Sequence, residues 1–198
     1  MEAMQKIKCL TIEDSNFPDR LRKLSGMPKK LYYIGNLPDP KKPAAAVVGA
    51  RMCSPYGRCQ AFKYARTMAS YGVQIISGMA RGIDAEGHKG ALDTDTPTFA
   101  VLGSGVDVCY PNSNRWLYQR ILEKGGGIIS ELPPGSPPVN WAFPARNRII
   151  SGLAEVVVIA EAKKKSGSLI TAEHALEQGK DIYVFPGRTT DALSYGCN

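Results

Sequence analysis

The sequence has few of the residues that build metal sites and disulfide frameworks. Among its 198 residues there are five cysteines and two histidines, and they form no CxxC pair and no Cys/His cluster. Zinc sites need such clusters at short spacings, so we expect no metal site. Scattered, reduced thiols in a cytoplasmic protein are the simplest interpretation of Cys9, Cys53, Cys59, Cys109 and Cys197.

The sequence also lacks long apolar runs. Its longest apolar run is far shorter than the roughly 20 residues of a membrane-spanning helix. No signal peptide is expected at its start. We therefore expect no membrane association.

Motifs for nucleotide cofactors are missing as well. The first strand-like run, Ala44–Val48, is followed by GARMCSPYG and not by G-x-G-x-x-G. The second ends at Ser77–Gly78, where a dinucleotide-binding fold carries an acidic residue. No G-x-x-x-x-G-K-[S/T] segment occurs either. These absences disfavour dinucleotide and NTP chemistry, and we expect no cofactor.

Catalytic groupings cannot be recognised in the sequence. His88 and His174 fall within expected helices and have no obvious Ser/Cys–Asp partner set. A nucleophile needs a base within hydrogen-bond reach, so catalytic use of either histidine is disfavoured.

The chain does carry an excess of positive charge. It has 25 Lys and Arg against 18 Asp and Glu, which gives a formal net charge of +7. Such an excess makes nucleic acid or another polyanion a plausible partner, although a basic enzyme would show the same balance.

Strand-like runs alternate with helix-like segments from Pro43 onward. The strand-like runs are Ala44–Val48, Val73–Ile76, Thr98–Leu102, Gly127–Ser130, Val156–Ala160 and Asp181–Phe185. The helix-like segments are Gly57–Tyr71, Ile83–Leu92, Asn114–Lys124 and Ser168–Gln178. This alternation predicts an α/β fold with a mainly parallel sheet and helices on both faces.

The first forty residues differ from the rest. We interpret residues 1–40 as a short N-terminal extension and residues 41–198 as one domain, which suits the length of the chain. In the extension, Asp14 or Ser15 is placed to cap a short helix. The stretch MPKKLYYIGNLP reads as an extended segment bounded by prolines.

Glycine, serine, arginine and lysine recur after the strand-like runs. In a parallel sheet the carboxyl ends of the strands meet at one edge, where helix N-termini offer unpaired N–H groups. Glycine allows close backbone approach, hydroxyls donate hydrogen bonds, and guanidinium groups bind phosphate in a bidentate manner. This edge is therefore expected to bind phosphate through Arg51, Ser54, Gly78, Arg81, Gly82, Gly103, Ser104, Gly105, Lys163, Ser166, Gly167 and Ser168.

Each of these features also has an ordinary structural explanation. Gly103–Gly105 is a common turn sequence, and Lys163–Lys165 is typical of a solvated loop. Asp84 either caps a helix, neutralises Arg81 or contacts the ligand. The repetition of such segments along the chain, rather than any one of them, favours phosphate binding.

Two arginines lie in the segment FPARNRIISGLAEVVVIAEA, which spans Phe143–Ala162. Guanidinium groups are rarely buried without a partner, so Arg146 and Arg148 need either protein carboxylates or an external anion. We expect both to face an anion pocket. The alternative for one of them is an ion pair with Glu131 or Glu161.

In order and spacing, these segments resemble the DNA-processing protein A family, also called DprA or Smf. The resemblance covers the chain from about Leu31 onward. The matching stretches are VVGAR…S.YG, ISGMARGIDAEGHKGAL, VLGSGVDVCYPNSN, GGIISELPPG, FPARNRIISGLA, VVVIAEA, SGSLITAEHALEQG and VFPG.

The resemblance implies an extended Rossmann-like fold and sequence-independent binding of single-stranded DNA. It also implies that the protein protects incoming DNA in natural transformation, helps load the RecA recombinase, forms a homodimer and is not an enzyme. Arg51 corresponds to the family's DNA-contacting arginine, and Phe143 either packs beside Pro144 or offers its ring to a base. To the residues listed for the sheet edge, this adds Phe143, Arg146, Asn147 and Arg148 as expected DNA-binding residues.

Two other functions stay open on the sequence alone. The nucleotide-hydrolysing LOG or lysine decarboxylase-like proteins share a related architecture, but they carry a PGGxGT-type segment followed by glutamates. This chain has SGSLITAEH there, with Glu173 at a loosely comparable position and no paired glutamates for acid–base work. The second is a pure interaction scaffold with a vestigial pocket.

Overall fold

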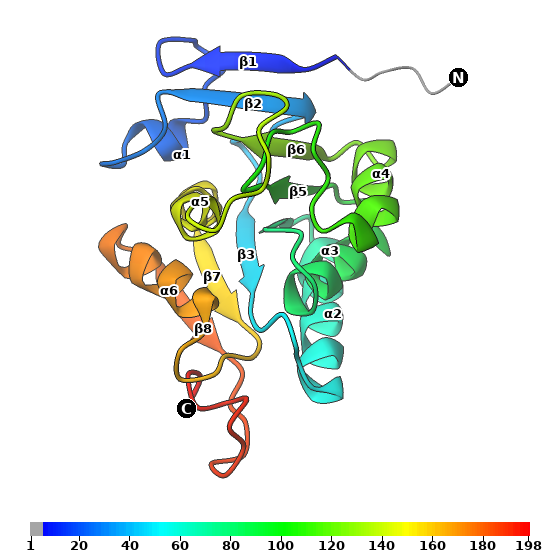
Figure 1. Ribbon diagram of the computed structural model, residues 1–198. Coiled ribbons are helices and arrows are strands. Elements are labelled where there is room, and N and C mark those ends of the chain that lie inside the picture. Colours follow the sequence, from blue (N-terminus) through cyan, green and yellow to red (C-terminus); the bar gives the residue numbers. More distant parts are fainter. Residues whose placement is uncertain (1–5) are drawn as a thin grey trace.

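A computed structural model describes residues 6–198, which form one eight-stranded sheet (Figure 1). The strand order is β1-β2-β6-β5-β4-β3-β7-β8. Strands β3 to β8 are mutually parallel, whereas β2 pairs antiparallel with both β1 and β6. The strands are β1 (Lys8–Thr11), β2 (Lys30–Gly35), β3 (Ala44–Val48), β4 (Gln74–Ser77), β5 (Thr98–Val101), β6 (Gly127–Ser130), β7 (Val156–Ile159) and β8 (Asp181–Val184).

Helices cover both faces of this sheet. Helices α1, α5 and α6 pack on one face, and α2, α3 and α4 pack on the other (Figure 1). Their bounds are α1 (Asp19–Arg22), α2 (Pro55–Ser70), α3 (Ile83–Leu92), the short 3-10 helix η1 (Asn112–Asn114), α4 (Arg115–Glu123), α5 (Ala142–Leu153) and α6 (Gly167–Glu177). The predicted α/β fold, Rossmann-like with a mainly parallel sheet, is confirmed. None of the helices within residues 6–198 combines the length and apolar character needed to cross a membrane.

The central strand β3 shows why the apolar run predicted a buried strand. Ala44, Ala46 and Val48 belong to the core beneath α5 and α6, and Ala45 and Val47 belong to the core beneath α2. Because successive side chains point to opposite faces, a strand covered on both faces must be apolar throughout.

Helix α5 was not predicted from the sequence. It contains Pro144, which discourages a helical interpretation of the segment. Pro144 is the third residue of the helix, however, and the N–H groups of the first turn have no helical partner in any case. Proline is therefore tolerated there, and the segment that carries Arg146 and Arg148 is helical.

The N-terminal segment joins the same sheet and core. Strand β2 confirms the extended stretch, and Phe17, Leu21 and Leu31 are buried against β3 and α5. The predicted cap of the short helix was wrong. Helix α1 follows Pro18 without a side-chain cap, while Asp14 accepts a hydrogen bond from the N–H of Thr11 (2.6 Å) and closes a turn. The division into residues 1–40 and 41–198 stays a prediction.

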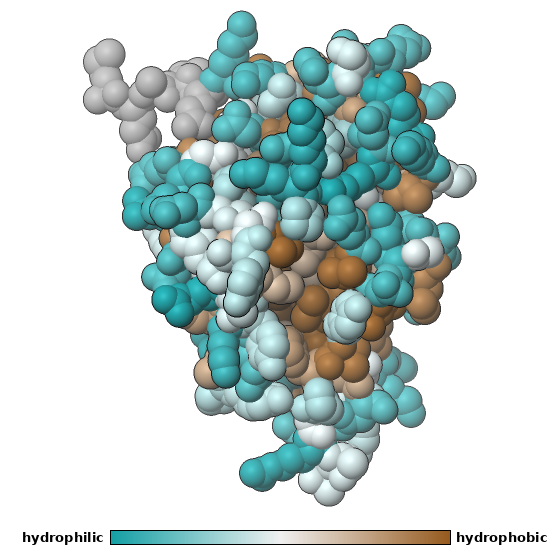
Figure 2. Space-filling model, turned by 180° about the vertical axis from the view of Figure 1, so that it is seen from behind, coloured by the Kyte–Doolittle hydropathy of each residue, from teal (hydrophilic) through white to brown (hydrophobic). Residues whose placement is uncertain are grey.

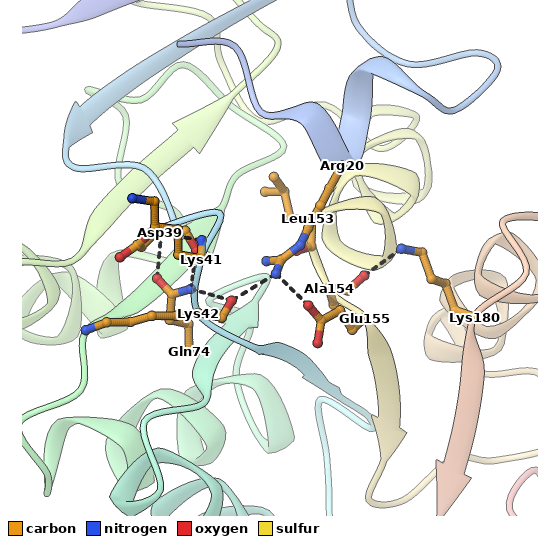
Figure 3. A network of polar contacts seen from close by, with 9 residues as sticks. All are labelled: Arg20, Asp39, Lys41, Lys42, Gln74, Leu153, Ala154, Glu155 and Lys180. Carbon is orange, nitrogen blue, oxygen red and sulfur yellow. Dashed lines mark hydrogen bonds and ion pairs between the residues drawn. The ribbon is translucent and has the colours of Figure 1, made fainter.

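A polar network closes the loops at the amino ends of the parallel strands (Figure 3). Arg20 Nη2 donates to Glu155 Oε1 (2.6 Å) and to the carbonyl of Lys42 (2.8 Å). Gln74 accepts from the N–H of Asp39 (2.8 Å) and donates to its carbonyl (2.9 Å). The side chains of Arg20, Glu155 and Gln74 are thus used inside the fold.

The surface seen from behind carries a gathered group of hydrophobic residues among hydrophilic ones (Figure 2). Gathered apolar side chains on a surface are typical of contacts with another protein.

The sheet has a switch point between β3 and β7. From β3 the chain first builds β4, β5 and β6 on one side, and later adds β7 and β8 on the other. In parallel sheets, ligands bind beyond the carboxyl ends of the strands at such a point.

Candidate functional site

A cavity of about 280 Å³ lies at this switch point. Its wall combines the segment after β3, the β4–α3 region, helix α5 and the start of α6. The lining residues are Val48, Gly49, Arg51, Ala80, Asp84, Asn140, Phe143, Pro144, Arg146, Asn147, Ile150, Ser166, Gly167, Ser168 and Thr171.

Seven of the expected DNA-binding residues are brought together in this wall. They come from three segments far apart in the sequence, and they are Arg51, Phe143, Arg146, Asn147, Ser166, Gly167 and Ser168. Their contact with DNA stays a prediction.

Arg51 is exposed at the rim of the cavity, and the loop that carries it is held by Glu161. The buried Glu161 carboxylate accepts from the N–H of Ser54 (2.7 Å) and from its hydroxyl (2.7 Å). The Glu161 carbonyl accepts from the N–H of Ala50 (2.8 Å). The Arg51 guanidinium lies 5.2 Å from the centre of the Phe143 ring. Ser54 was expected to bind phosphate, but its side chain is already used to position the Arg51 loop.

Arg146 is buried and forms the floor of the cavity. Its Nη1 donates to the carbonyls of Gly78 (2.7 Å) and Val101. A side chain on residue 78 would overlap the guanidinium, so glycine is required there and Gly78 acts through Arg146. Burial lowers the pKa of Arg146 to about 10, with Asp84 opposing and Arg51 adding to the shift. Arg146 is therefore still positively charged near neutral pH.

Asp84 balances part of this charge from inside the fold. Its carboxylate accepts a hydrogen bond from the N–H of Gly78 (3.1 Å). Burial raises the pKa of the Asp84 carboxyl, and the charge of Arg146 opposes that shift. The charged side chains that line the cavity are Arg51, Arg146 and Asp84, so positive groups outnumber negative ones by one.

His88 is a buried neutral residue behind this floor. Its Nδ1 lies 2.7 Å from the hydroxyl of Thr98, which itself donates to the carbonyl of Ile75 (2.7 Å). Nδ1 must therefore carry the proton, and Nε2 has no partner among the described residues. Burial, followed by the charge of Arg146, lowers the pKa of His88 to about 3.

The Ser166 turn forms the opposite wall. The Ser166 hydroxyl caps α6 and lies 2.7 Å from the hydroxyl of Ser168. Asn147 Nδ2 donates to the carbonyl of Gly167 (3.1 Å), which ties this turn to α5. Ser166 accepts from the N–H groups of Ser168 and Leu169, so the N–H of Gly167 and the dipole of the first turn of α6 are what favour an anion at this position.

Arg148 does not face the cavity, and the expectation for it is corrected. Its guanidinium makes a bidentate pair with Glu131, at 2.9 and 2.7 Å, and also donates to the carbonyl of Gly26 (2.8 Å). Residues two apart on a helix do not share a face, so Arg146 and Arg148 point in different directions. Glu131 is therefore the structural partner.

The Gly103–Gly105 turn lies beside the cavity without lining it. Gly103 packs against Phe143, and the hydroxyl of Ser104 donates to the carbonyl of Val108 (2.8 Å). The N–H of Gly105 donates to the carbonyl of Ser136 (2.9 Å). These contacts favour the structural explanation of this turn.

Arg81, Gly82 and Lys163 also lie outside the cavity wall. Arg81 is exposed and its Nε donates to the hydroxyl of Ser113 (3.4 Å). Gly82 precedes α3 and touches the backbone of Arg51. Lys163 is exposed.

Sequence reasoning missed the roles of three polar residues at this site. Asn140 and Thr171 line the cavity, and Glu161 positions the Arg51 loop. Thr171 lies one helical turn after Gly167, so helical spacing could have found it. Glu161 follows the buried run of β7, and a carboxylate at that place signals a partner nearby. Within residues 6–198, no three His, Cys, Asp or Glu side chains gather so that they could hold a metal ion.

Comparison with known proteins gives a consistent result. A family model described as DNA recombination-mediator protein A matches residues 8–198. DNA processing protein DprA of Streptococcus pneumoniae is 43% identical over 194 residues, which cover 98% of this chain and 68% of that protein. Protein Smf of Synechocystis is 39% identical over 192 residues, 95% of this chain and 48% of that protein. The chain thus spans about half to two thirds of these relatives.

Solved structures agree with this result. The match to the structure of DprA from Streptococcus pneumoniae has a TM-score of 0.90. It covers 98% of this chain and 68% of that chain. A structure of DNA processing protein A from Helicobacter pylori, described as revealing its single-stranded DNA binding mode, is 32% identical with a TM-score of 0.84. This match covers 97% of this chain and 86% of the Helicobacter pylori chain. The resemblance read from the sequence motifs is confirmed.

Proposed function

This chain belongs to the DNA recombination-mediator protein A family, and from that premise we propose that its cavity binds single-stranded DNA without sequence preference. One observation carries the proposal. Arg51 and Arg146 share the cavity with the Ser166 turn, and neither arginine has an ion pair with a carboxylate among residues 6–198. The Helicobacter pylori relative, described as binding single-stranded DNA, supports it.

The electrostatics of the cavity favour a phosphate group. The charge of Arg51 contributes to the lowered pKa of Arg146, so the two guanidinium groups disfavour each other. A phosphate bound beside them would relieve this repulsion and accept charge-assisted hydrogen bonds. The N–H of Gly167 at the start of α6 offers a further donor.

The same groups explain the absence of sequence preference. Guanidinium groups and helix N–H groups recognise phosphate oxygens, and the Phe143 ring offers a face on which any base can stack. Every nucleotide presents these features.

The proposal includes the partners that the family resemblance implies. These are RecA, which the protein would help load onto single-stranded DNA in recombination and natural transformation, and a second copy of the chain. The hydrophobic surface seen in Figure 2 is compatible with a protein partner. We also propose a cytoplasmic location, where the protein would protect incoming DNA.

We propose a binding protein rather than an enzyme. Asp84 is the one carboxylate among the residues that line the cavity, and it accepts a hydrogen bond from the N–H of Gly78. Glu173 is exposed on α6 and does not line the cavity. Hydrolysis of a ribose–base bond by a LOG-like enzyme needs paired acid–base groups. We expect no ribose release from nucleoside monophosphates, and release would support that alternative.

The test is the anisotropy of labelled oligo-dT measured across salt concentrations. We expect Arg51→Ala to weaken binding about tenfold or more, because it removes charge-assisted hydrogen bonds to phosphate. The control is Arg66→Ala, which removes the same charge from a surface pair with Asp93 (2.6 Å) and should change affinity less than about twofold. Affinity of the wild type should fall as salt rises. Salt-independent binding, or equal losses in the two variants, would contradict the proposal.

A further inference from the structure

The cavity is too small for a strand of DNA. Its volume of about 280 Å³ lies just below the range of small-molecule sites, roughly 300–1,000 Å³, and leaves room for about one nucleotide. A bound strand must therefore continue over the surface on leaving the cavity.

An aromatic contact leads away from the cavity. The Phe143 ring contacts the Arg51 guanidinium, at 5.2 Å from its centre, and the Tyr110 ring, at 5.4 Å between centroids. Tyr110 is 43% exposed, so its ring extends this contact to the outer surface. Bases of a single strand stack on such exposed rings, largely independently of sequence.

Several exposed arginines form no ion pair among residues 6–198. Six arginines, Arg20, Arg22, Arg58, Arg66, Arg120 and Arg148, pair with carboxylates. The exposed arginines that pair with no carboxylate among residues 6–198 are Arg51, Arg81, Arg115 and Arg188. Of these four, Arg51 lines the cavity.

Arg81 and Arg115 are connected to the cavity rim. Gly82 touches the backbone of Arg51, which places Arg81 next to the Arg51 loop. Arg81 contacts Ser113 in η1 (3.4 Å), three residues after Tyr110, and Arg115 starts α4 immediately after η1.

A second exposed ring follows these cations. Trp116 is half exposed, and Lys89 lies 5.7 Å from the centre of its ring. Cations interleaved with exposed aromatic rings are the pattern by which proteins hold single-stranded nucleic acid.

On the basis of the proposed function, we propose that the bound strand leaves the cavity past Tyr110 and runs over a second surface. This exit surface consists of Tyr110, Arg81, Ser113, Arg115 and Trp116. The two arginines contact phosphates outside the cavity, and the two rings stack on bases.

The experiment compares two lengths of oligo-dT, of about four and about twenty nucleotides. The short one occupies the cavity and extends only a little beyond it, and the long one also covers the exit surface. The test variant is Arg81→Ala combined with Arg115→Ala. The control variant is Arg66→Ala combined with Arg120→Ala, which removes the same charge from arginines paired with Asp93 and Glu123.

We expect the test variant to bind the long oligonucleotide about tenfold more weakly and the short one nearly as the wild type does. The control variant should change both affinities less than about twofold. Unchanged binding of the long oligonucleotide, or equal losses at both lengths, overturns the exit surface. If Arg51→Ala still weakens binding in that case, the proposed function stands and the surface serves another partner. If the wild type binds neither length, the proposed function falls as well.

Discussion

The two edges of the parallel sheet differ in how Arg20 and Arg51 are held. At the amino edge, Arg20 is paired with Glu155, and Lys180 donates to the carbonyl of Ala154 at 2.8 Å (Figure 3). At the carboxyl edge, Arg51 contacts the ring of Phe143 and pairs with no carboxylate among residues 6–198. The difference separates cations that stabilise the fold from cations that are available to a ligand.

The carboxyl edge itself has a fixed floor and an exposed rim. The floor is Arg146, held by backbone carbonyls, and the rim is Arg51 with the Ser166 turn. Substitutions in the floor should therefore affect stability, and substitutions at the rim should affect binding.

The largest effect is expected for Gly78→Ala, which breaks the floor. The added methyl group overlaps the Arg146 guanidinium, which is buried and cannot move aside without losing its hydrogen bonds. We expect a loss of about 3 kcal/mol in the free energy of unfolding, measured by chemical denaturation. Gly167→Ala is the matched control at the rim, because a methyl group there meets no atom within 4 Å. It should stay within about 0.5 kcal/mol of the wild type. Equal stability of the two variants would remove the distinction between floor and rim.

The next effect is expected for Arg148→Ala, two residues from the floor on the same helix. Arg148 and Glu131 are each about one fifth exposed and make a bidentate pair. Removing one partner should cost about 2 kcal/mol of stability, because the other is left without its ion pair. Affinity for oligo-dT should not change. A double-mutant cycle with Glu131→Gln measures the coupling, and a loss of DNA affinity without a loss of stability would return Arg148 to the binding site.

These two arginines show where sequence reasoning stopped. Arg146 and Arg148 are the same residue type in one short segment, and only the phase of α5 decides which of them faces the cavity. The segment was not predicted as a helix, so the phase was unknown. The sheet was predictable, by contrast, because a strand buried on both faces must be apolar throughout.

The candidate site was predictable to the extent that it depends on topology. Arg51 and the Ser166 turn follow neighbouring parallel strands, so the fold brings them together. Ser54 and Ser104 also follow strands, but the structure uses their hydroxyls internally. Ser54 contacts Glu161, which is 107 residues away, and no local pattern reports such a partner.

A smaller effect, which depends on pH, is expected for His88 behind the floor. Its folded pKa of about 3 lies below the usual 6.5, so the unfolded chain binds the proton first as pH falls. Between about pH 7.5 and 5.5 this should cost about 1.4 kcal/mol of stability. His88→Gln should lose this slope. The titration of Asp84 changes stability in the opposite direction, because burial raises the pKa of its carboxyl. Asp84 is present in both the wild type and the His88→Gln variant, so its contribution cancels in the comparison. Identical slopes in the two proteins would show that His88 titrates normally.

The smallest effect tests the comparison of the two edges directly. Arg20→Ala and Arg51→Ala remove one positive charge each, so a protein that binds DNA through net charge alone should lose the same affinity in both cases. We expect Arg20→Ala to change oligo-dT affinity less than about twofold, because its guanidinium is already used by Glu155 and the carbonyl of Lys42. Its cost should appear in stability instead, at about 1 kcal/mol, because Glu155 remains partly exposed and recovers water. Arg51→Ala should show the reverse, with stability preserved and binding lost. Anisotropy measures the DNA affinity of both variants, and chemical denaturation measures their stability. The distinction between the edges requires that Arg20→Ala lose mainly stability and Arg51→Ala lose mainly affinity. Equal losses of affinity would indicate only a diffuse attraction between a basic protein and an acidic polymer.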